Sequence, residues 1–491
     1  MMASKKLTSR QKDFFELVSR AAFSCPFAPE RDRLDRQIAG ADESVPRQEV
    51  LARVLAKVRD ELNRLGAGRD LRLDDLSTED AGLLRLALLF DLFHRAIPDL
   101  DAHIRKQLKA GDEPVAVPFA GELLGTMQGW GLPEAEALRF LAFFHQLRRA
   151  FYFIAENLVG DSPCMVEFRR RLWTNVFTVD IARYETYLWN RMEDFSTLLL
   201  GETGSGKGAA AAAIGRSGHI PFDARRSRFR ESFVATFVDI NLSQFPETLI
   251  ESELFGHRRG AFTGAVEQHT GVFARCSSHG AIFLDEIGEV SGPVQVKLLR
   301  VLQERTFSPV GSREQLHFSG RVIAATNRRL DELRASGAFR DDFYYRLCSD
   351  VIEVPPLRQR IAEDAGELKR LVAVVVRRMI GEESRSLVDW LCAELRRQLP
   401  RNYPWPGNVR ELEQAVRRLM LNGVYAGENC PLTPDADLLQ RIGSGRLSAA
   451  ELLQGYCAEL YARHGTYEEV ARITGLDRRT VKKYVQAALS D

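Results

Sequence analysis

The sequence lacks a close pair of cysteines and an excess of charge of either sign. Its 7 cysteines include no Cys-x-x-Cys pair and have no histidine beside them at zinc-ligand spacing, so we expect reduced, mostly buried thiols. The 68 Lys and Arg residues balance 67 Asp and Glu residues, so the molecule as a whole has no field that attracts nucleic acid or a membrane. Any binding to nucleic acid must therefore be local.

Long apolar runs are also missing. The first twenty residues mix charged and apolar side chains and lack the apolar core of a signal peptide. The most apolar stretch, 83–93, is interrupted by Arg85 and Asp91 and is too short to span a bilayer. We therefore expect a cytoplasmic protein that makes no use of a membrane. Its 45% hydrophobic and 27% charged residues are typical of a folded soluble chain, and 491 residues predict about three domains.

The pattern of apolar and polar residues changes along the chain. Amphipathic helical patterns fill residues 1–157, which predicts an all-α N-terminal domain. Short strand-like runs, each followed by a turn or a helix start, occupy 158–355 and predict an α/β core with a parallel sheet. Helical patterns return in 356–430, a predicted lid, and after the turn-rich linker at 427–439 an all-α unit fills 440–491.

A glycine-rich loop stands between a strand-like run and a helix-forming run, the context of a phosphate-binding P-loop. Its backbone N–H groups can close around the β-phosphate, and Lys207 can reach the β- and γ-phosphates. Gly208 stands where a hydroxyl usually ligates Mg²⁺, so other groups must hold the metal. The predicted cofactors are ATP and Mg²⁺. The loop residues are Gly201, Glu202, Thr203, Gly204, Ser205, Gly206, Lys207 and Gly208.

An acidic pair ends the apolar run 281–284. Asp285 would organise Mg²⁺, and Glu286 would polarise the attacking water. Such a pair on its own is more often a helix cap or a solvent-facing turn. Because it follows a P-loop, we interpret it as the second carboxylate motif of an ATPase.

Residues 253–265 contain a hexapeptide bracketed by glycines, Gly260-Ala261-Phe262-Thr263-Gly264-Ala265. With it, the chain from about 158 to 491 resembles the AAA+ activators of sigma-54 RNA polymerase, the bacterial enhancer-binding proteins, whose signature this hexapeptide is. The resemblance implies a AAA+ core and a partner, sigma-54 RNA polymerase, which the hexapeptide touches. A glycine-rich hairpin with a buried Phe262 is the structural alternative.

The resemblance also implies roles for polar residues around the nucleotide. Asn241 resembles the asparagine that pairs with Glu286 and couples hydrolysis to the position of the loop. Thr326 and Asn327 resemble the sensor that reads the γ-phosphate, and Arg410 resembles a second sensor directed at the γ-phosphate from the lid.

Two arginines resemble the arginine-finger segment of the family. Arg340 and Arg346 would reach the ATP of a neighbouring subunit, for which a planar, permanently charged guanidinium is suited. Catalysis would then require a homo-oligomeric ring, of six or seven subunits by family analogy. Two surface arginines on a helix are the alternative. Besides Gly208, where the family has glutamate, the chain departs from the family pattern in its longer segments 178–193 and 222–232.

Residues 465–485 have the plan of a helix-turn-helix and resemble the Fis-type module of the family. Gly475 would take the turn and Asp477 would cap the second helix. The implied partner is DNA at an upstream site, although a solvated basic face is the alternative. The predicted apolar contacts are Val470, Ala471, Leu476, Val481 and Val485. The predicted DNA-contacting residues are Arg478, Arg479, Thr480, Lys482 and Lys483.

Residues 1–157 show no phosphoacceptor-receiver pattern, so we expect a sensor of an unknown signal that controls the ring. His94, His103 and His145 lie among apolar helices, where a structural role is more common than metal binding. The leading hypothesis is a mechanochemical transcription activator. The alternatives are a AAA+ remodeller of another protein client and a DNA-binding regulator whose ATPase is impaired at Gly208.

Overall fold

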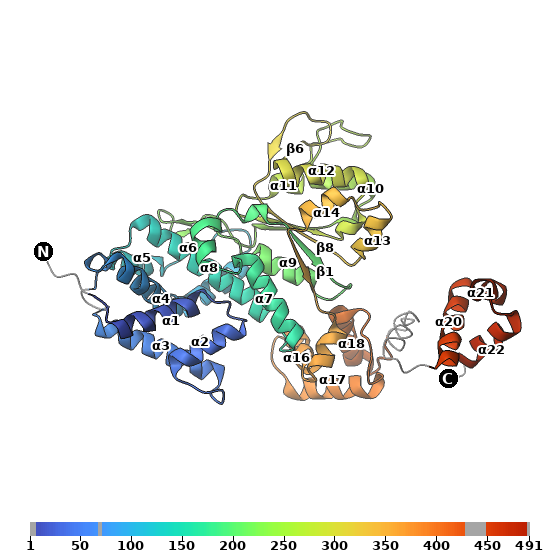
Figure 1. The fold of residues 1–491 in the computed structure, drawn as a ribbon. Helices are drawn as coiled ribbons and strands as arrows, with labels where there is room; N and C mark the ends of the chain where they lie inside the picture. The colour runs from blue at the N-terminus through green and yellow to red at the C-terminus, as the bar shows by residue number, and fades with distance from the viewer. Residues whose placement is uncertain (1–5, 67–70, 428–447, 489–491) are drawn as a thin grey trace. The chain divides into compact units, whose positions relative to one another are not determined.

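The computed structural model describes residues 6–66, 71–427 and 448–488. Its ribbon is drawn in Figure 1. The chain divides into two compact units, Met1–Val424 and Tyr425–Asp491. The predicted linker, apart from its first residue, and the expected domain limits at 430 and 440 lie outside the described residues. Within the described part of the chain, no helix combines the length and apolar character needed to cross a bilayer.

Helices make up the first part of the larger unit. Thr8 opens the first helix with a capping box, in which its hydroxyl accepts a hydrogen bond from the Gln11 backbone N–H. The longest helix has 33 residues and begins at a second cap, Ser77. The elements are α1 (Ser9–Phe23), α2 (Pro29–Ala39), α3 (Arg47–Arg64), η1 (Leu73–Asp75), α4 (Thr78–Ala110), α5 (Ala120–Gly129), α6 (Glu134–Phe151) and η2 (Tyr152–Glu156).

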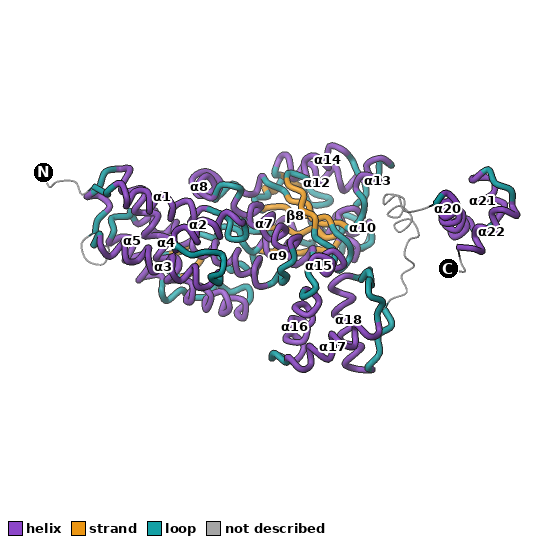
Figure 2. The backbone as a smooth tube through the Cα atoms, turned by 60° about the horizontal axis from the view of Figure 1, so that its bottom comes forward, coloured by secondary structure: helices purple, strands orange, loops and turns teal. Residues whose placement is uncertain are grey.

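Five parallel strands form the central sheet, in the order β4-β5-β8-β1-β9. Figure 2 shows these strands surrounded by helices. Their apolar runs are buried, as expected for strands covered on both faces. The predicted parallel α/β fold is therefore confirmed. The strands are β1 (Thr197–Leu200), β4 (Phe237–Asn241), β5 (Ala281–Asp285), β8 (Arg321–Thr326) and β9 (Asp350–Glu353).

Connecting segments complete the α/β core, and four helices follow it as the lid. Two small antiparallel hairpins, β2–β3 and β6–β7, stand apart from the sheet. The core elements are α7 (Pro163–Phe177), α8 (Ile181–Arg183), η3 (Tyr184–Leu188), η4 (Met192–Asp194), α9 (Lys207–Gly215), β2 (Phe222–Asp223), β3 (Arg228–Phe229), η5 (Leu242–Gln244), α10 (Glu247–Phe255), α11 (Val272–Arg275), η6 (Ile287–Glu289), α12 (Gly292–Glu304), β6 (Thr306–Phe307), β7 (Leu316–His317), α13 (Leu330–Ala335) and α14 (Asp341–Leu347). The lid helices are α15 (Leu357–Glu363), α16 (Glu367–Ile380), α17 (Arg385–Gln398) and α18 (Asn408–Asn422).

Alternate strand residues enter two different hydrophobic cores, because successive side chains point to opposite faces of a sheet. Leu198 and Ile282 pack in the core that includes α10, α12 and α14. Leu199 and Phe283 pack in the core that includes α7 and α9, and the same cluster continues through the N-terminal helices as far as Leu7. One face of the sheet therefore shares a single core with the N-terminal helices.

The smaller unit contains three described helices, α20 (Ala449–His464), α21 (Tyr467–Thr474) and α22 (Arg478–Ala488). A capping box at Ser448 and Glu451 starts α20. Gly475 ends α21 with a φ of 70°, a left-handed conformation that glycine adopts at little cost. The small core is made of Cys457, Leu460, Val470, Val481 and Val485, with Ala471 and Leu476 packed against it.

Candidate functional site

The P-loop connects β1 to α9 through two glycines in the left-handed region. Gly204 has a φ of 75° and Gly206 a φ of 112°. A Cβ atom on Gly204 would come 2.2 Å from the carbonyl oxygen of Gly407 in the lid, so a side chain at this position would clash. The lid loop packs directly on this glycine, since the Val409 N–H donates to the Gly204 carbonyl at 3.1 Å.

Further contacts fasten the lid to the loop. Glu202 forms a bidentate ion pair with Arg358, with both N–O distances 2.7 Å. This contact holds the pKa of Glu202 below its usual value. Asn408, which is buried and has a φ of 53°, donates to Glu202 Oε2 and to the Thr203 carbonyl, both at 3.1 Å. Neither Arg358 nor Asn408 was predicted from the sequence to be part of the site.

Lys207 is buried at the first position of α9, the positive end of the helix dipole. Its Nζ donates to the Gly201 carbonyl at 2.8 Å and to the Glu202 carbonyl at 3.2 Å. Burial lowers the pKa of Lys207, while the nearby Glu286 and Asp285 oppose that shift. A buried ammonium beside two carboxylates is a suitable partner for an anionic phosphate bound with a divalent cation.

Ser205 provides an independent sign that the loop receives a ligand. Its side chain is 5% exposed, and its Oγ has no hydrogen-bond partner among the described residues. Buried hydroxyls in native proteins are nearly always satisfied. A phosphate oxygen or a Mg²⁺-bound water at this loop would satisfy the Ser205 hydroxyl, so the residues present fit a nucleotide with its metal.

The acidic pair lies at the carboxyl end of β5. Burial raises the pKa of Asp285, and the charge of Lys207 opposes that shift. Glu286 has a φ of 57°, an uncommon conformation for a residue with a side chain and one that occurs often at functional positions. Its Oε2 accepts a hydrogen bond from the Asn327 backbone N–H at 3.4 Å. Asn327 Nδ2 also donates to Thr203 Oγ1 at 2.9 Å, so the segment after β8 contacts the P-loop.

Asn241 lies at this edge but makes different contacts from those expected. The strand register places it opposite Asp285. Its Oδ1 accepts hydrogen bonds from the N–H and the hydroxyl of Ser243, at 3.0 and 2.7 Å, and so caps the following turn. Among the described contacts, the expected pair with Glu286 is not formed.

A cavity of about 510 Å³ joins these groups. The P-loop from Thr203, the acidic pair, Asn241 and Arg410 line its polar side. Val159, Met165 and Phe168 line it as well, together with lid residues such as Leu371 and Val375. The cavity thus combines a polar end for phosphates with an apolar end suited to a flat base.

The hexapeptide 260–265 forms a compact turn. The Gly260 N–H donates to the Ala265 carbonyl at 2.8 Å, and the Ala265 N–H donates to the Phe262 carbonyl at 3.0 Å. Gly260 and Gly264 both have a positive φ. Phe262 is 37% exposed, and its ring lies 4.9 Å from that of His257. Phe262 is therefore exposed, and the alternative of a hairpin with a buried Phe262 is wrong.

The two candidate arginine fingers lie on α14 and at its start. Arg340 forms an ion pair with Asp342 at 2.8 Å, and Arg346 donates to the Leu302 carbonyl at 3.0 Å. Both are exposed, and neither lines the cavity of its own P-loop. Their action on the ATP of a neighbouring subunit therefore stays a prediction.

Comparison with known proteins assigns a family. The Sigma-54 interaction domain matches residues 184–353. Nitrogen fixation protein VnfA of Azotobacter vinelandii is 39% identical over 334 residues, 66% of this chain and 57% of that protein. Transcriptional regulatory protein ZraR of Klebsiella oxytoca is 38% identical over 332 residues, 66% of this chain and 67% of that protein. The chain belongs to the sigma-54-dependent transcriptional activators.

This membership confirms the resemblance inferred from the motifs. DNA-binding transcriptional regulator NtrC of Azospirillum brasilense is also similar, with 36% identity over 336 residues, 64% of this chain and 61% of that protein. Of these three relatives, the alignments span 57 to 67% of their own length.

The C-terminal unit of this family member presents a basic helix. Asp477 Oδ1 accepts hydrogen bonds from the N–H groups of Arg479 and Thr480, at 2.9 and 3.1 Å, which caps α22 as expected. The Thr480 hydroxyl donates to Asp477, so it is engaged in the cap. Arg478 forms an ion pair with Glu468 at 2.9 Å. Arg479, Lys482 and Lys483 are exposed.

Proposed function

We propose that this protein is an ATP-hydrolysing activator that remodels sigma-54 RNA polymerase through the loop 260–265. The observation that carries the proposal is the Phe262-Thr263 tip, presented at the surface of the same α/β core that holds the P-loop cavity. An exposed aromatic side chain on a glycine-bracketed turn is suited to grip a partner protein.

The proposed chemistry assigns a role to each group of the cavity. Lys207 and Arg410 bind phosphate oxygens, and Asp285 and the Ser205 hydroxyl hold Mg²⁺ directly or through water. The metal would neutralise charge on the phosphates when bound. Glu286 orients and polarises the attacking water, and Asn327 links it to the P-loop.

A physical path connects this chemistry to the loop. Asn241 ends β4, which pairs with β5 beside Asp285, and α10 follows β4 and leads directly to the loop. A shift of Glu286 or Asn241 on hydrolysis would therefore move α10, and with it the tip.

Arg340 and Arg346 would complete the site of the next subunit, so the active form would be a ring of six or seven copies. Their exposure and their absence from their own cavity support this arrangement. Through Arg478, Arg479, Lys482 and Lys483, α22 would contact DNA upstream of the promoter, with Thr480 near its start.

The test is transcription in vitro from a sigma-54 promoter with purified full-length protein and ATP. The variant Thr263→Ala should hydrolyse ATP at the parental rate and lose activation, because only the partner contact is changed. Thr270→Ala, a second exposed threonine just beyond the loop, is the matched control and should activate normally. Equal activation by the parent and Thr263→Ala would contradict the role of the loop. Normal ATPase with no activation by any of the three would indicate another protein client.

A further inference from the structure

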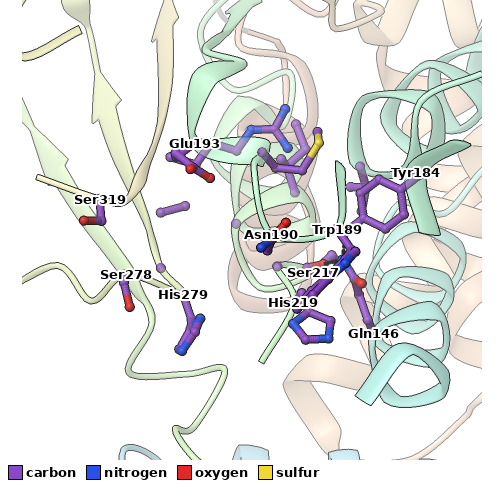
Figure 3. A pocket seen from close by; sticks show the side chains of 18 residues that line it. Gln146, Tyr184, Trp189, Asn190, Glu193, Ser217, His219, Ser278, His279 and Ser319 are labelled. Carbon is purple, nitrogen blue, oxygen red and sulfur yellow. Dashed lines mark hydrogen bonds between the residues drawn. The ribbon is translucent and has the colours of Figure 1, made fainter. Parts of the chain in front are cut away.

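A second cavity lies at the other end of the P-loop helix from the phosphate loop. It has a volume of about 250 Å³ and is drawn in Figure 3. Ser217 and His219, just after α9, line it, as do Ala281 and Arg321, the first residues of β5 and β8. Because the acidic pair and the sensor follow the opposite ends of those strands, this amino-edge cavity is separate from the nucleotide cavity.

Residues from several separate parts of the chain line the amino-edge cavity. Tyr184 and Trp189 come from segment 178–193. The Trp189 ring meets the His219 ring edge-on, with centroids 4.5 Å apart. Helix α6 of the N-terminal region adds Gln146. Figure 3 shows these four side chains together on one side of the cavity.

Two buried polar atoms of the cavity lining have no hydrogen-bond partner among the described residues. Gln146 is 1% exposed. Its Nε2 donates to Tyr184 Oη at 2.6 Å and to the Ser217 carbonyl at 2.9 Å, whereas its Oε1 has no partner. His219 Nε2 is also unpartnered. Because an unpaired buried acceptor is costly, a ligand that donates a hydrogen bond here would remove that cost.

The lining favours an uncharged ligand with a flat ring. Its charged side chains are Glu193 and Arg321, whose charges balance, and the Arg321 guanidinium is already bonded to neighbouring backbone and side-chain oxygens. Burial lowers the pKa of His219 to about 3, so its ring is neutral at physiological pH. Trp189 offers an aromatic surface, and Gln146 Oε1 calls for an N–H donor.

The same helix α6 holds the P-loop helix by its C-terminal end. Arg149 is 0% exposed and donates to the carbonyls of Arg216 and Gly218, both at 2.6 Å, while Gln146 donates to the carbonyl between them. The positive charge of Arg149 lies at the negative, C-terminal end of the dipole of α9. Lys207 begins that nine-residue helix, so the same short helix connects the carbonyls that Arg149 binds with the P-loop.

We propose that the amino-edge cavity binds a small uncharged aromatic molecule with a ring N–H, and that its occupancy changes ATP turnover through Gln146, Arg149 and α9. The binding step stands on the cavity alone. The effect on turnover rests on the proposed ATPase function.

Binding is tested by calorimetry of the full chain with indole and with 1-methylindole, whose methyl group removes the donor. Indole should bind with a dissociation constant of about 1 mM or lower, and 1-methylindole about tenfold more weakly. Absence of indole binding at concentrations well above this value, or equal affinity for the two probes, would overturn the proposal.

Variants locate the bound probe. Trp189→Ala should weaken indole binding about tenfold, and His219→Phe, which keeps a ring of similar shape, should weaken it severalfold. Trp390→Ala, at a 43% exposed tryptophan of the lid, is the matched control and should bind like the parent. If parent and both cavity variants bind indole equally, the probe lies elsewhere and the proposal fails.

Measurement of ATP turnover distinguishes the proposed binding of the ligand from its proposed effect on the ATPase. Saturating indole should change the ATP turnover of the parent by about twofold or more, and Trp189→Ala should show no such response. If indole left the ATP turnover of the parent unchanged, the proposed regulatory step would be overturned. If the protein binds indole but hydrolyses no ATP under any condition, the proposed ATPase function fails while the binding site stands.

Discussion

The two edges of the central sheet are built differently. At the carboxyl edge, functional groups follow directly after strands: the P-loop after β1, Asp285 and Glu286 at β5, and Asn327 after β8. At the amino edge, the cavity walls include Gln146 of the N-terminal helices and residues of segment 178–193, and segment 222–232 packs in the same hydrophobic core as those helices. This chain thus places its candidate nucleotide site at strand ends, whereas segments 178–193 and 222–232 carry its contacts with the N-terminal helices.

Both of these segments contact the N-terminal helices. In the first, Glu185 forms an ion pair with Arg139 of α6 at 2.8 Å. In the second, Phe229 stacks on His145 with ring centroids 3.7 Å apart, and Ser232 Oγ donates to the Gly111 carbonyl at 2.7 Å. Segments 178–193 and 222–232 therefore form part of the surface on which the N-terminal helices pack.

The largest expected effect concerns the carboxyl edge. Glu286→Gln should lower ATP turnover by about 100-fold or more while ATP still binds, because the amide cannot accept a proton from the attacking water. Steady-state hydrolysis and nucleotide titration measure the two properties. Glu289→Gln, which alters a surface pair with Arg328, should leave turnover close to that of the parent. A similar loss in both variants would contradict the assignment.

At the amino edge, we expect an effect on stability. Arg149→Ala should lower the free energy of unfolding by about 2–4 kcal/mol, because two buried carbonyls lose their donor. Arg53→Ala, at an exposed pair with Glu49, should change it by about 0.5 kcal/mol or less. Denaturant titration of both variants compares them. Equal effects would show that the contact between α6 and α9 contributes no more than a surface ion pair.

Acid should also act on the amino edge. Burial, aided by the charge of Arg149, lowers the pKa of His103 to about 4. The stabilisation from neutral His103 is complete above about pH 6.5, the pKa of histidine in the unfolded chain. It is lost as the pH falls from there towards 4, because His103 of the unfolded chain takes up a proton first. At pH 5 the loss is about 2 kcal/mol.

Denaturant titration of the parent and of His103→Phe at pH 7 and pH 5 isolates the share of His103, because His94, His145 and His219, whose pKa values burial also lowers, are present in both proteins. His103→Phe should show a loss smaller by the same amount, since the ring that titrates is gone. If the variant and the parent lost equal stability on acidification, another group would be responsible.

The smallest effect is expected at Gly208. It lies in the first turn of α9, and the nearest atom to an added Cβ would be Phe283 Cε1 at 4.0 Å. Gly208→Ala should therefore raise the free energy of unfolding by about 0.5–1 kcal/mol and leave ATP affinity unchanged, because the backbone N–H is kept. A thermal melt and a nucleotide titration check this. A destabilised variant would mean that the glycine is required for the backbone conformation.

The candidate site residues at the carboxyl edge of the sheet could be predicted from the sequence because their motifs are local. The P-loop and the acidic pair each occupy a few consecutive residues, and parallel strands bring their ends together. The contacts of Arg358 and Asn408 with Glu202 could not be predicted, since they join residues about 150 to 200 positions apart. Likewise, periodicity showed that α6 has a buried face but not that the face meets α9.

The most direct test is the binding of sigma-54 to the protein trapped with ADP and aluminium fluoride. We predict a stable complex with the parent in the trapped state, none without nucleotide, and none with Thr263→Ala in either state. A parent protein that binds the trapped nucleotide and still fails to retain sigma-54 would contradict the claim that ATP chemistry drives the 260–265 loop onto the polymerase.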